Sequence, residues 1–300
     1  MIHNLDELMQ HAKSRPRCIV AVAAAEDRHV LEALQAATGE GIVDPLLVGN
    51  KLEIEEIAHA IGFSLKGIKI VDHAGDGAAS ARIAVSMVRA GEADILMKGG
   101  VSTGDLLKAV LDRESGLRRE EQLLSHVAFF QSPYYHKLFC VTDVAMNIAP
   151  NLEEKAQIIN NAVRACQLMG IETPKVAVAA AVEKVNPKME ATVHAALLKE
   201  MNLDGRIGGC VVDGPFAIDI AVNREAALHK GIGSEVAGDC DIILVPDIEA
   251  GNIFYKALNF LGGAVSAAAV MGASVPVVLT SRSDDERSKL FSIALAACLR

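Results

Sequence analysis

The sequence is poor in aromatic side chains and in positive charge. It contains no tryptophan, and the aromatic residues make up 4% of the chain. Lysine and arginine number 29 against 38 aspartates and glutamates, which gives a formal net charge of −9. Nucleic-acid-binding proteins usually show a basic stripe, and those that bind single strands add aromatic rings on which bases stack. We therefore expect no nucleic-acid partner and a small-molecule ligand instead.

Long apolar runs and paired cysteine motifs are also missing. Apolar stretches such as residues 18–25 and 177–182 are far shorter than the roughly 20 residues of a membrane helix. The N-terminal segment carries Asp6 and Glu7 where a signal peptide has basic residues. We expect a cytoplasmic protein without a membrane span. The six cysteines include no Cys-x-x-Cys pair, so we expect them to be reduced, buried and structural.

Strand-like and helix-like segments alternate along the chain. Apolar runs predict strands at residues 17–24, 44–48, 68–71, 95–97, 138–141, 176–180, 209–212, 242–245 and 276–280. Apolar residues at helical spacing predict helices at residues 26–38, 52–61, 77–90, 106–111, 152–169, 189–201, 252–261 and beyond residue 285. This alternation indicates an α/β fold, in which a mostly parallel sheet carries helices on both faces.

The length of 300 residues suits two domains. Because no low-complexity linker is present, the boundary must be a tight crossing, which we place at residues 133–137. The Gly262-Gly263 break predicts a return crossing at residues 261–266. The first domain would then comprise residues 1–136 and 264–300, and the second domain residues 137–263.

The junction after the last predicted strand has the richest chemistry. It consists of Ser281, Arg282, Ser283, Asp284 and Asp285. Ligands of open α/β sheets bind outside the carboxyl ends of the strands, where the Arg282 guanidinium matches a phosphate and an adjacent acid can move a proton. Ser283 with Glu286 also has the pattern of a helix capping box. Capping explains the acids, but it leaves Ser281 and Arg282 unexplained.

A second polar strand end follows residues 95–97. Lys98 leads into Gly99-Gly100, and the hydroxyls of Ser102 and Thr103 come next. A lysine, two hydroxyls and backbone amides can cradle a phosphate, although no Walker A loop is present. A helix-capping role for Ser102 or Thr103 explains the hydroxyls at least as well.

Two later strand ends carry acids, and the histidines form no metal motif. Asp213 precedes Gly214-Pro215, which predicts a turn. Asp247 and Asn252 lie at the start of a predicted helix, where Asn252 is a helix cap or a ligand contact. The nine histidines show no metal-ligand spacing, so we expect no bound metal. His126, just before an apolar stretch, is the one histidine that we single out.

Six motifs follow one another in a fixed order. They are residues 97–105 (Met-Lys-Gly-Gly-Val-Ser-Thr-Gly-Asp), 142–147 (Thr-Asp-Val-Ala-Met-Asn), 182–189 (Val-Glu-Lys-Val-Asn-Pro-Lys-Met), 213–215 (Asp-Gly-Pro), 246–252 (Pro-Asp-Ile-Glu-Ala-Gly-Asn) and 280–282 (Thr-Ser-Arg). From about residue 15 to the C-terminus, their order and spacing resemble the phosphate acetyl/butyryltransferase family, and its butyryltransferase branch in particular. Any one motif would be weak evidence, whereas six in order are specific.

The resemblance implies a fold and a reaction. The fold is a two-domain, three-layer α/β/α arrangement like that of isocitrate and isopropylmalate dehydrogenases, with the active site in the interdomain cleft. The family forms homodimers or higher homo-oligomers. The implied reaction converts an acyl-CoA and phosphate into an acyl phosphate and coenzyme A, with butyryl preferred and acetyl as a second acyl group. Coenzyme A is a substrate here, and no cofactor is implied.

The resemblance also implies roles for individual residues. The Ser-Arg pair of the family's active site maps onto Ser281 and Arg282. The acid that the acetyltransferase branch carries about seven positions after the serine is Ser288 here. The base is therefore left open among the nearby acids, with Asp284 and Asp285 as the catalytic candidates beside Glu286. Substrate-binding roles are expected for Lys98, Ser102, Thr103, Asp213, Asp247 and Asn252.

Two other functions are compatible with this sequence. A nicotinamide- and metal-dependent dehydrogenase of the same fold would need a divalent metal site, which the sequence does not visibly assemble. A non-catalytic coenzyme A-binding protein would retain the fold without turnover, and the intact Ser281-Arg282 pair counts against it.

Overall fold

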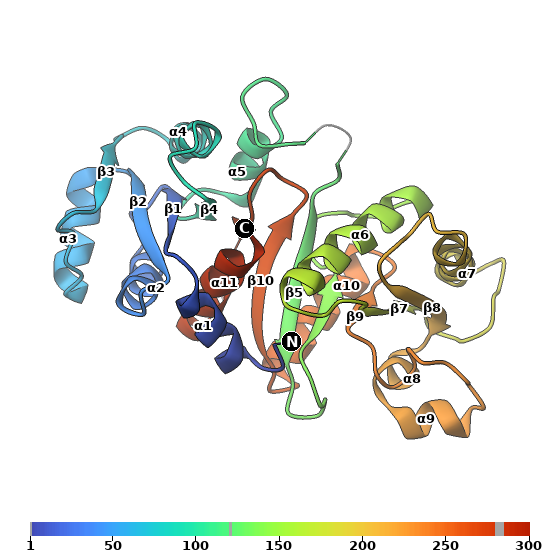
Figure 1. Ribbon diagram of the computed structural model, residues 1–300. Coiled ribbons are helices and arrows are strands. Elements are labelled where there is room, and N and C mark those ends of the chain that lie inside the picture. The colour runs from blue at the N-terminus through green and yellow to red at the C-terminus, as the bar shows by residue number, and fades with distance from the viewer. Residues whose placement is uncertain (1, 120–121, 280–284) are drawn as a thin grey trace. The chain divides into compact units, whose positions relative to one another are not determined.

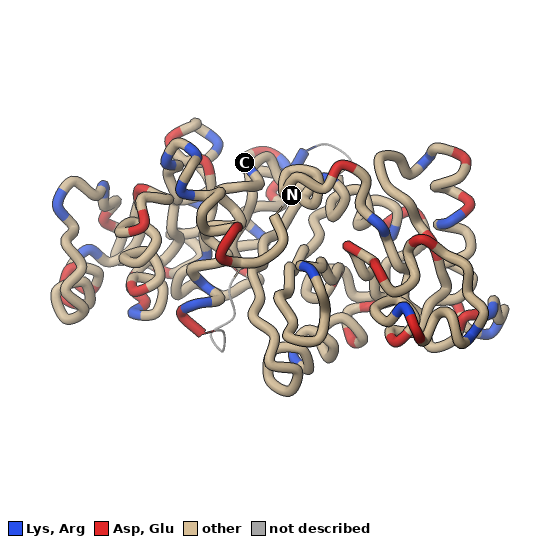
Figure 2. The backbone as a smooth tube through the Cα atoms, turned by 60° about the horizontal axis from the view of Figure 1, so that its bottom comes forward, with Lys and Arg blue, Asp and Glu red and all other residues tan. Residues whose placement is uncertain are grey.

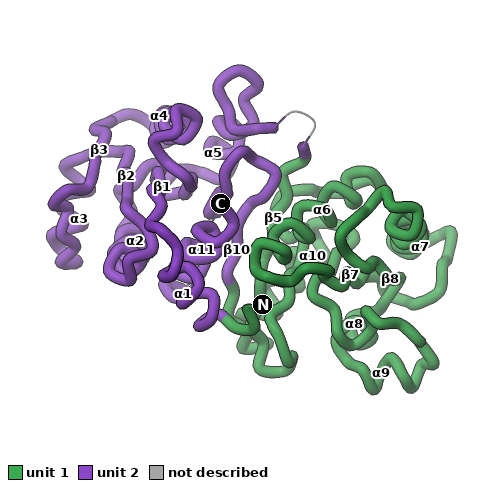
Figure 3. Tube along the Cα trace, viewed as in Figure 1, with its two compact units in different colours: residues 1–4, 123–266 green, residues 5–122, 267–300 purple. Residues whose placement is uncertain are grey.

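The chain forms two compact α/β units, which Figure 3 shows in different colours. The computed structural model describes residues 2–119, 122–279 and 285–300. Unit 1 comprises residues 1–4 and 123–266, and unit 2 comprises residues 5–122 and 267–300. Each unit combines a mainly parallel sheet with helices, as the alternating sequence pattern predicts.

The strands of unit 2 form a parallel sheet except for the antiparallel pair β10 and β11 (Figure 1). In the order β3-β2-β1-β4-β11-β10, its strands are β1 (Cys18–Ala23), β2 (Val43–Gly49), β3 (Lys69–Asp72), β4 (Ile95–Lys98), β10 (Val265–Met271) and β11 (Val277–Val278). Residues 20–23 of β1 are completely buried, as expected for a parallel strand that is covered on both faces. β10 and β11 pair antiparallel, with Val270 opposite Val277.

The helices of unit 2 follow from the order of its strands. They are α1 (Leu5–Ser14), α2 (Arg28–Gly39), α3 (Lys51–Ile61), α4 (Gly77–Arg89), α5 (Thr103–Val110) and α11 (Glu286–Leu299). The chain runs outward through β1, β2 and β3 and then returns to place β4 on the other side of β1. Because such crossovers are right-handed, α2 and α3 cover one face and α4 the other. The reversal makes the carboxyl ends of β1 and β4 the expected ligand-binding edge.

The strands of unit 1 have a similar plan, in which β5 pairs antiparallel with β6 (Figure 1). In the order β5-β6-β9-β7-β8, its strands are β5 (Ser125–Gln131), β6 (Phe139–Thr142), β9 (Ile242–Leu244), β7 (Lys175–Ala179) and β8 (Val211–Phe216). Its helices are α6 (Leu152–Leu168), α7 (Glu190–Leu203), α8 (Ile218–Val222), α9 (Arg224–His229) and α10 (Ile248–Phe260). β6, β9, β7 and β8 are parallel, so their carboxyl ends meet at one edge.

The chain enters unit 1 earlier than at the predicted crossing, because strand β5 was not predicted. β5 pairs antiparallel with β6 in register Ala128↔Val141, so the chain has entered unit 1 by residue 123 rather than at residues 133–137. Pro133 lies in the connection between these two strands instead of between the units. The return crossing lies at residues 266–267, within β10.

The distribution of charged residues along the chain is mixed, as the composition indicates. Basic and acidic residues are interspersed along the tube in Figure 2. None of the helices among the described residues combines the length and the hydropathy that a membrane crossing requires.

All six cysteines are buried and unpaired, as predicted. Burial raises the pKa of the Cys18 thiol to about 11.

An ionic cluster joins the amino ends of the unit 1 strands. Asp239 accepts hydrogen bonds from Lys175 and from His136, and Lys137 lies 3.0 Å from its Oδ1. Burial opposes the ionisation of Asp239, but these partners outweigh it and hold the pKa of the carboxyl well below its usual range. The ionised aspartate therefore stabilises the fold above its unfolded-state pKa of about 3.9, and this contribution is lost as the pH falls towards the folded-state pKa.

Replacement of Asp239 by asparagine should reduce the free energy of unfolding most at neutral pH. The difference from the unmodified protein should shrink below a pH of about 4, because the unfolded chain then binds a proton at Asp239 that the folded protein does not. Urea unfolding at several pH values measures this. The Asp44→Asn variant removes the exposed ion pair with Arg17 and should change stability little at any pH. A pH-independent loss in Asp239→Asn would contradict the assignment.

Candidate active site

Lys98 and two glycines form the carboxyl end of β4 in unit 2. The buried Lys98 ammonium donates to the carbonyl oxygens of Gly99, at 3.1 Å, and Val101, at 3.2 Å. The Gly99 N–H donates to Ala23 O and the Gly100 N–H to Ala24 O. A Cβ at residue 99 would lie 2.1 Å from Ala24 O, so only glycine fits there. These two amides are therefore occupied, which corrects the expectation that they cradle a phosphate.

Ser102 and Thr103 begin α5 directly after this loop. Ser102 is the N-cap: its Oγ accepts the Asp105 N–H at 3.1 Å and donates to Asp105 Oδ2 at 2.7 Å. Thr103 is the exposed first residue of the helix. The capping interpretation of Ser102 is thus confirmed, and the Thr103 hydroxyl lies at the positive end of the helix dipole, where anions are favoured.

The C-terminal junction is only partly described. Asp285 is the N-cap of α11, and its Oδ1 accepts the Ser288 N–H at 2.7 Å. The helix begins at Glu286 with Asp285 as its cap, which is two residues later than the capping-box pattern of Ser283 with Glu286 predicts. The predicted site residues Ser281, Arg282 and Asp284 lie outside the described residues.

Asp143 is a buried carboxylate at the carboxyl end of β6 that the sequence analysis did not select. Its Oδ1 accepts the N–H groups of Ala145, at 2.9 Å, and Met146, at 3.0 Å, and its Oδ2 accepts the Asn147 amide. Burial raises the pKa of this carboxyl, although these hydrogen bonds and the His126 backbone N–H oppose the rise. Asp143 thus holds the loop of residues 143–147 in place. Its position directly after a strand, in Thr142-Asp143, was the available signal.

The helix α10 packs against this loop. It begins at Ile248 with Asp247 as its N-cap, and the Asp247 Oδ1 accepts the Ala250 N–H at 2.8 Å. Asn252 is therefore inside the helix and is not its cap, which corrects the alternative that we considered. Its Nδ2 lies 3.4 Å from Val144 O, and a Cβ at Gly251 would lie 2.4 Å from Asp143 O. The structure thus brings Asp247 and Asn252 together beside the loop that Asp143 organises.

Asp213 lies inside β8 and not at a turn. The strand continues to Phe216, and the Gly214-Pro215 bond within it is cis. Asp213 Oδ1 forms an ion pair of 2.7 Å with Lys199 Nζ on α7 and also accepts the Gly214 N–H. The pattern Asp-Gly-Pro predicted a turn because turn propensity is local, whereas here pairing with β7 keeps the backbone in the sheet.

His126 lies next to Asp143 on the neighbouring strand β5. Its imidazole is buried, meets the Tyr255 ring edge-on at 6.4 Å, and has no hydrogen-bond partner for Nδ1 in the described structure. Burial lowers the pKa of His126 to about 4, so the ring is neutral at physiological pH. The histidine that the sequence singled out is therefore a buried neutral side chain at the candidate edge of unit 1.

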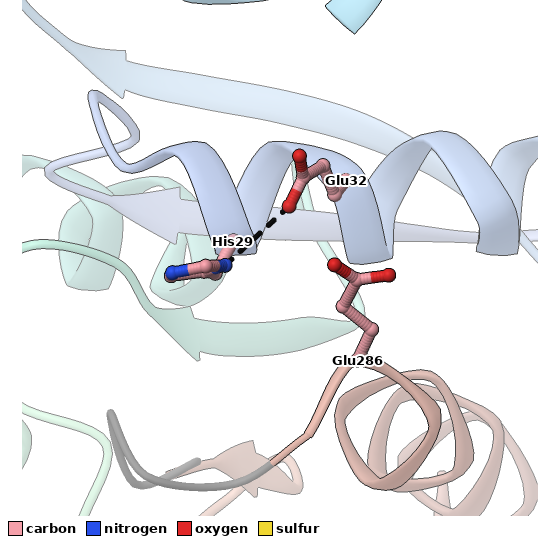
Figure 4. Close-up of side chains that lie close together, drawn as sticks. All are labelled: His29, Glu32 and Glu286. Carbon is pink, nitrogen blue, oxygen red and sulfur yellow. Dashed lines mark ion pairs between the residues drawn. The ribbon is translucent and has the colours of Figure 1, made fainter.

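One cluster of potential metal ligands is found among the described residues, in unit 2 (Figure 4). The ligand atoms of His29, Glu32 and Glu286 lie within 4.8 Å of one another. Glu32 already pairs with Arg28 at 2.8 Å, and His29 and Glu286 are exposed. Surface ion pairing explains this cluster without an ion.

Comparisons with known proteins agree with the six-motif resemblance. The sequence matches the family described as Phosphate acetyl/butaryl transferase over residues 4–80 and 77–297. It is 46% identical to the Phosphate butyryltransferase of Clostridium acetobutylicum over 297 residues, 99% of this chain and 98% of that protein. It is 47% identical to the Phosphate acetyltransferase of Thermotoga maritima over 293 residues, 98% of both chains.

A solved structure extends the comparison to the fold. The crystal structure of a branched-chain phosphotransacylase from Enterococcus faecalis V583 superimposes with a TM-score of 0.83 at 35% identity. The match covers 94% of this chain and 98% of that chain. Family match, near-full-length identity and fold all point the same way, and the chain belongs to the phosphate acetyl/butyryl transferase family.

Proposed function

We propose that this protein catalyses the reversible transfer of a short acyl group between coenzyme A and inorganic phosphate. The observation that carries the proposal is its near-full-length similarity to enzymes that are named for this transfer. The polar strand ends of the two units supply the kinds of side chain that such a reaction needs.

The chemistry requires fixed positive charge at the junction of Ser281 and Arg282. A phosphate oxygen attacks the thioester carbon, the carbonyl oxygen becomes an oxyanion, and the carbon–sulfur bond then breaks to release the coenzyme A thiolate. We assign Arg282 to the phosphate and the developing oxyanion, and Ser281 to a hydrogen bond with the departing sulfur. Loss of one such stabilising group typically raises the barrier by about 3 kcal/mol. Binding both substrates in one site supplies the remaining advantage, so no acyl-enzyme is required.

The reverse reaction needs a base for the coenzyme A thiol. Asp284 and Asp285 are the two acids that we selected, and the Asp285 carboxylate already accepts the N–H of Ser288 as the cap of α11. A second duty as a base would compete with that hydrogen bond. We therefore assign the thiol proton to Asp284, with Asp285 in a supporting role.

The remaining candidates divide into contacts and supports. We assign a phosphate contact to Thr103, whose exposed hydroxyl lies at the start of α5, and a carbonyl contact to the Asn252 amide. Lys98 and Ser102 are engaged within their own loop, so they shape that binding edge. In unit 1, Asp213 holds Lys199 through an ion pair, and Asp247 caps the start of α10.

The acyl preference that we propose is butyryl over acetyl. Relatives named for each acyl group share almost the same identity with this chain, so overall similarity does not separate the two. Thiol release from acetyl-, propionyl-, butyryl- and isobutyryl-CoA at one phosphate concentration tests the preference. The ratio kcat/KM should be highest for a four-carbon acyl group, and a maximum at acetyl would overturn the assignment.

We also propose an architecture, an oligomeric state and a cellular location for this protein. On the basis of the family resemblance, we propose a two-domain isocitrate dehydrogenase-like architecture with an interdomain active site, a homodimer and a cytoplasmic location. Sedimentation velocity measures the oligomeric state. Nicotinamide reduction in the presence of a divalent metal would favour the dehydrogenase alternative, and tight coenzyme A binding without turnover would favour a non-catalytic binding protein.

A further inference from the structure

A buried lysine without a counter-ion lies in the first half of α6. Lys155 is only 3% exposed, and its Nζ lies 3.0 Å from the Nδ1 of His194 on α7. Within the described ranges, no carboxylate oxygen approaches the Nζ to within 4.0 Å. Glu190 and Asp247 act on the ammonium only from longer distances. The positive charge of Lys155 is thus buried against a neutral partner.

The hydrogen bond fixes the tautomer of His194. An ammonium group can only donate, so the Nδ1 of His194 must accept and the ring proton must be on Nε2. Burial, followed by the charge of Lys155, lowers the pKa of His194, which keeps the ring neutral. The pair therefore carries one positive charge and directs one N–H group, on Nε2, away from Lys155.

The surroundings of the pair carry both signs of charge. The amino-terminal halves of α6 and α7 favour an anion, whereas Glu153 and Glu154 lie in the first turn of α6 and Glu190 in that of α7. Lys155 is the fourth residue of α6 and His194 the fifth residue of α7, and these two helices contact each other (Figure 1). Both groups lie in the amino-terminal half of their helix, near the positive end of its dipole. They also follow the carboxyl ends of β6 and β7, which is the edge that carries Asp143 and Asp247.

This arrangement is unfavourable unless an anion completes it. A buried charge that lacks an ionic partner destabilises a protein by several kcal/mol, and an apolar side chain of similar size is often better. Helix N-termini beside a cation commonly bind phosphate in proteins. The His194 side chain is 15% exposed, so its ring is the part of the pair that a ligand can reach.

We propose that the Lys155–His194 pair binds a phosphate group, which accepts the Nε2–H of His194 while Lys155 supplies the buried charge behind it. The choice of phosphate, from inorganic phosphate or from coenzyme A, rests on the proposed function. The Glu190 carboxylate lies 3.9 Å from His194 Nε2 and is 81% exposed. It is a competing anion that the ligand displaces.

The tautomer and the ligand contact are measurable without any turnover. In protein labelled with ¹⁵N-histidine, the His194 signals, assigned by their loss in His194→Gln, should show the Nε2–H tautomer. They should shift on titration with inorganic phosphate, with coenzyme A, or with both, and the ligand that shifts them identifies the source of the phosphate group. A proton on Nδ1, or no shift with either ligand, would overturn the proposal.

Three variants separate ligand binding from a merely structural role. Lys155→Met should weaken binding of the identified ligand by about 10- to 100-fold, the loss expected for a charged hydrogen-bonding group, while the melting temperature does not fall. Glu190→Gln should instead tighten binding by about two- to fivefold, because it removes the competing charge. Lys51→Met, an exposed lysine at the start of α3, should leave binding unchanged.

The outcomes also distinguish this proposal from the proposed function. Absence of phosphate-dependent turnover together with a His194 shift would remove the acyltransferase function and keep the anion site. Normal turnover with unchanged ligand affinity in Lys155→Met and Glu190→Gln would remove the anion site alone. If Lys155→Met fails to fold, unchanged affinity in the exposed Glu190→Gln variant is sufficient to reject the proposal.

Discussion

Replacement of Arg282 by lysine should lower turnover at saturating phosphate and butyryl-CoA by about 100- to 1000-fold, the range seen when one transition-state donor is lost. Lysine keeps the positive charge but loses the planar fork that holds a phosphate through two parallel hydrogen bonds. The loss should therefore appear in kcat as well as in the KM for phosphate. Steady-state kinetics of thiol release measure both quantities.

A second arginine provides the control for this prediction. Arg287 is exposed on α11, over the ring of Phe291 at 5.3 Å and 3.9 Å from Asp6. Its replacement by lysine should leave kcat within about twofold of the wild type, because exposed pairs of this kind contribute little. Circular dichroism should show both variants to be folded. Wild-type turnover in Arg282→Lys would remove Arg282 from the mechanism.

Replacement of Asp143 by alanine should lower the free energy of unfolding by about 3–5 kcal/mol. The change leaves the N–H groups of Ala145 and Met146 and the amide of Asn147 without their acceptor in a buried loop. Each unsatisfied buried donor costs about 1–3 kcal/mol, and partial rehydration of the loop keeps the total below their sum. Urea unfolding at neutral pH measures the change.

An exposed helix cap serves as the matched control. Asp76 accepts the Ala79 N–H at 2.7 Å as the N-cap of α4, and its replacement by alanine should cost only about 1 kcal/mol. Equal losses in Asp76→Ala and Asp143→Ala would show that Asp143 does no more than an ordinary cap. That result would contradict its assigned role in organising the candidate edge of unit 1.

Hydrophobic periodicity was sufficient for most elements of this fold. The apolar runs of β1, β2 and β4 and the periodic faces of α2, α4 and α6 lie within one to two residues of their predicted ranges. These elements were predictable because local propensity and burial favour the same structure. Strands β5 and β10 were the exceptions, because neither was predicted. β10 is rich in alanine, which has a low strand propensity, so only its neighbours in the sheet specify it.

Helix starts were predicted less well, for a physical reason. The segments around the starts of α10 and α11 each offer several side chains that can cap a helix, and their sequence alone does not decide which one does so. Asp247 is the cap although Asn252 has the same propensity, and Asp285 is the cap although Ser283 fits the capping box. The sequence therefore identified the segments in which these helices begin, but not the residues that cap them.

Site residues that depend on distant partners could not be predicted. In the sequence, Lys155 has the pattern of an ordinary helix residue. Only the packing of α6 against α7 brings its Nζ close to His194. Asp143 gains its importance from a loop that closes on its carboxylate. In contrast, the order of the six motifs was enough to identify the family, because it does not depend on where each side chain points.

The most direct test of the acyltransferase assignment is the rate of free thiol release from butyryl-CoA by the purified protein as inorganic phosphate is varied. We predict a rate that rises to saturation with phosphate, with one butyryl phosphate formed for each thiol released. Absence of phosphate-dependent release from acetyl-, propionyl- and butyryl-CoA alike would contradict the assignment.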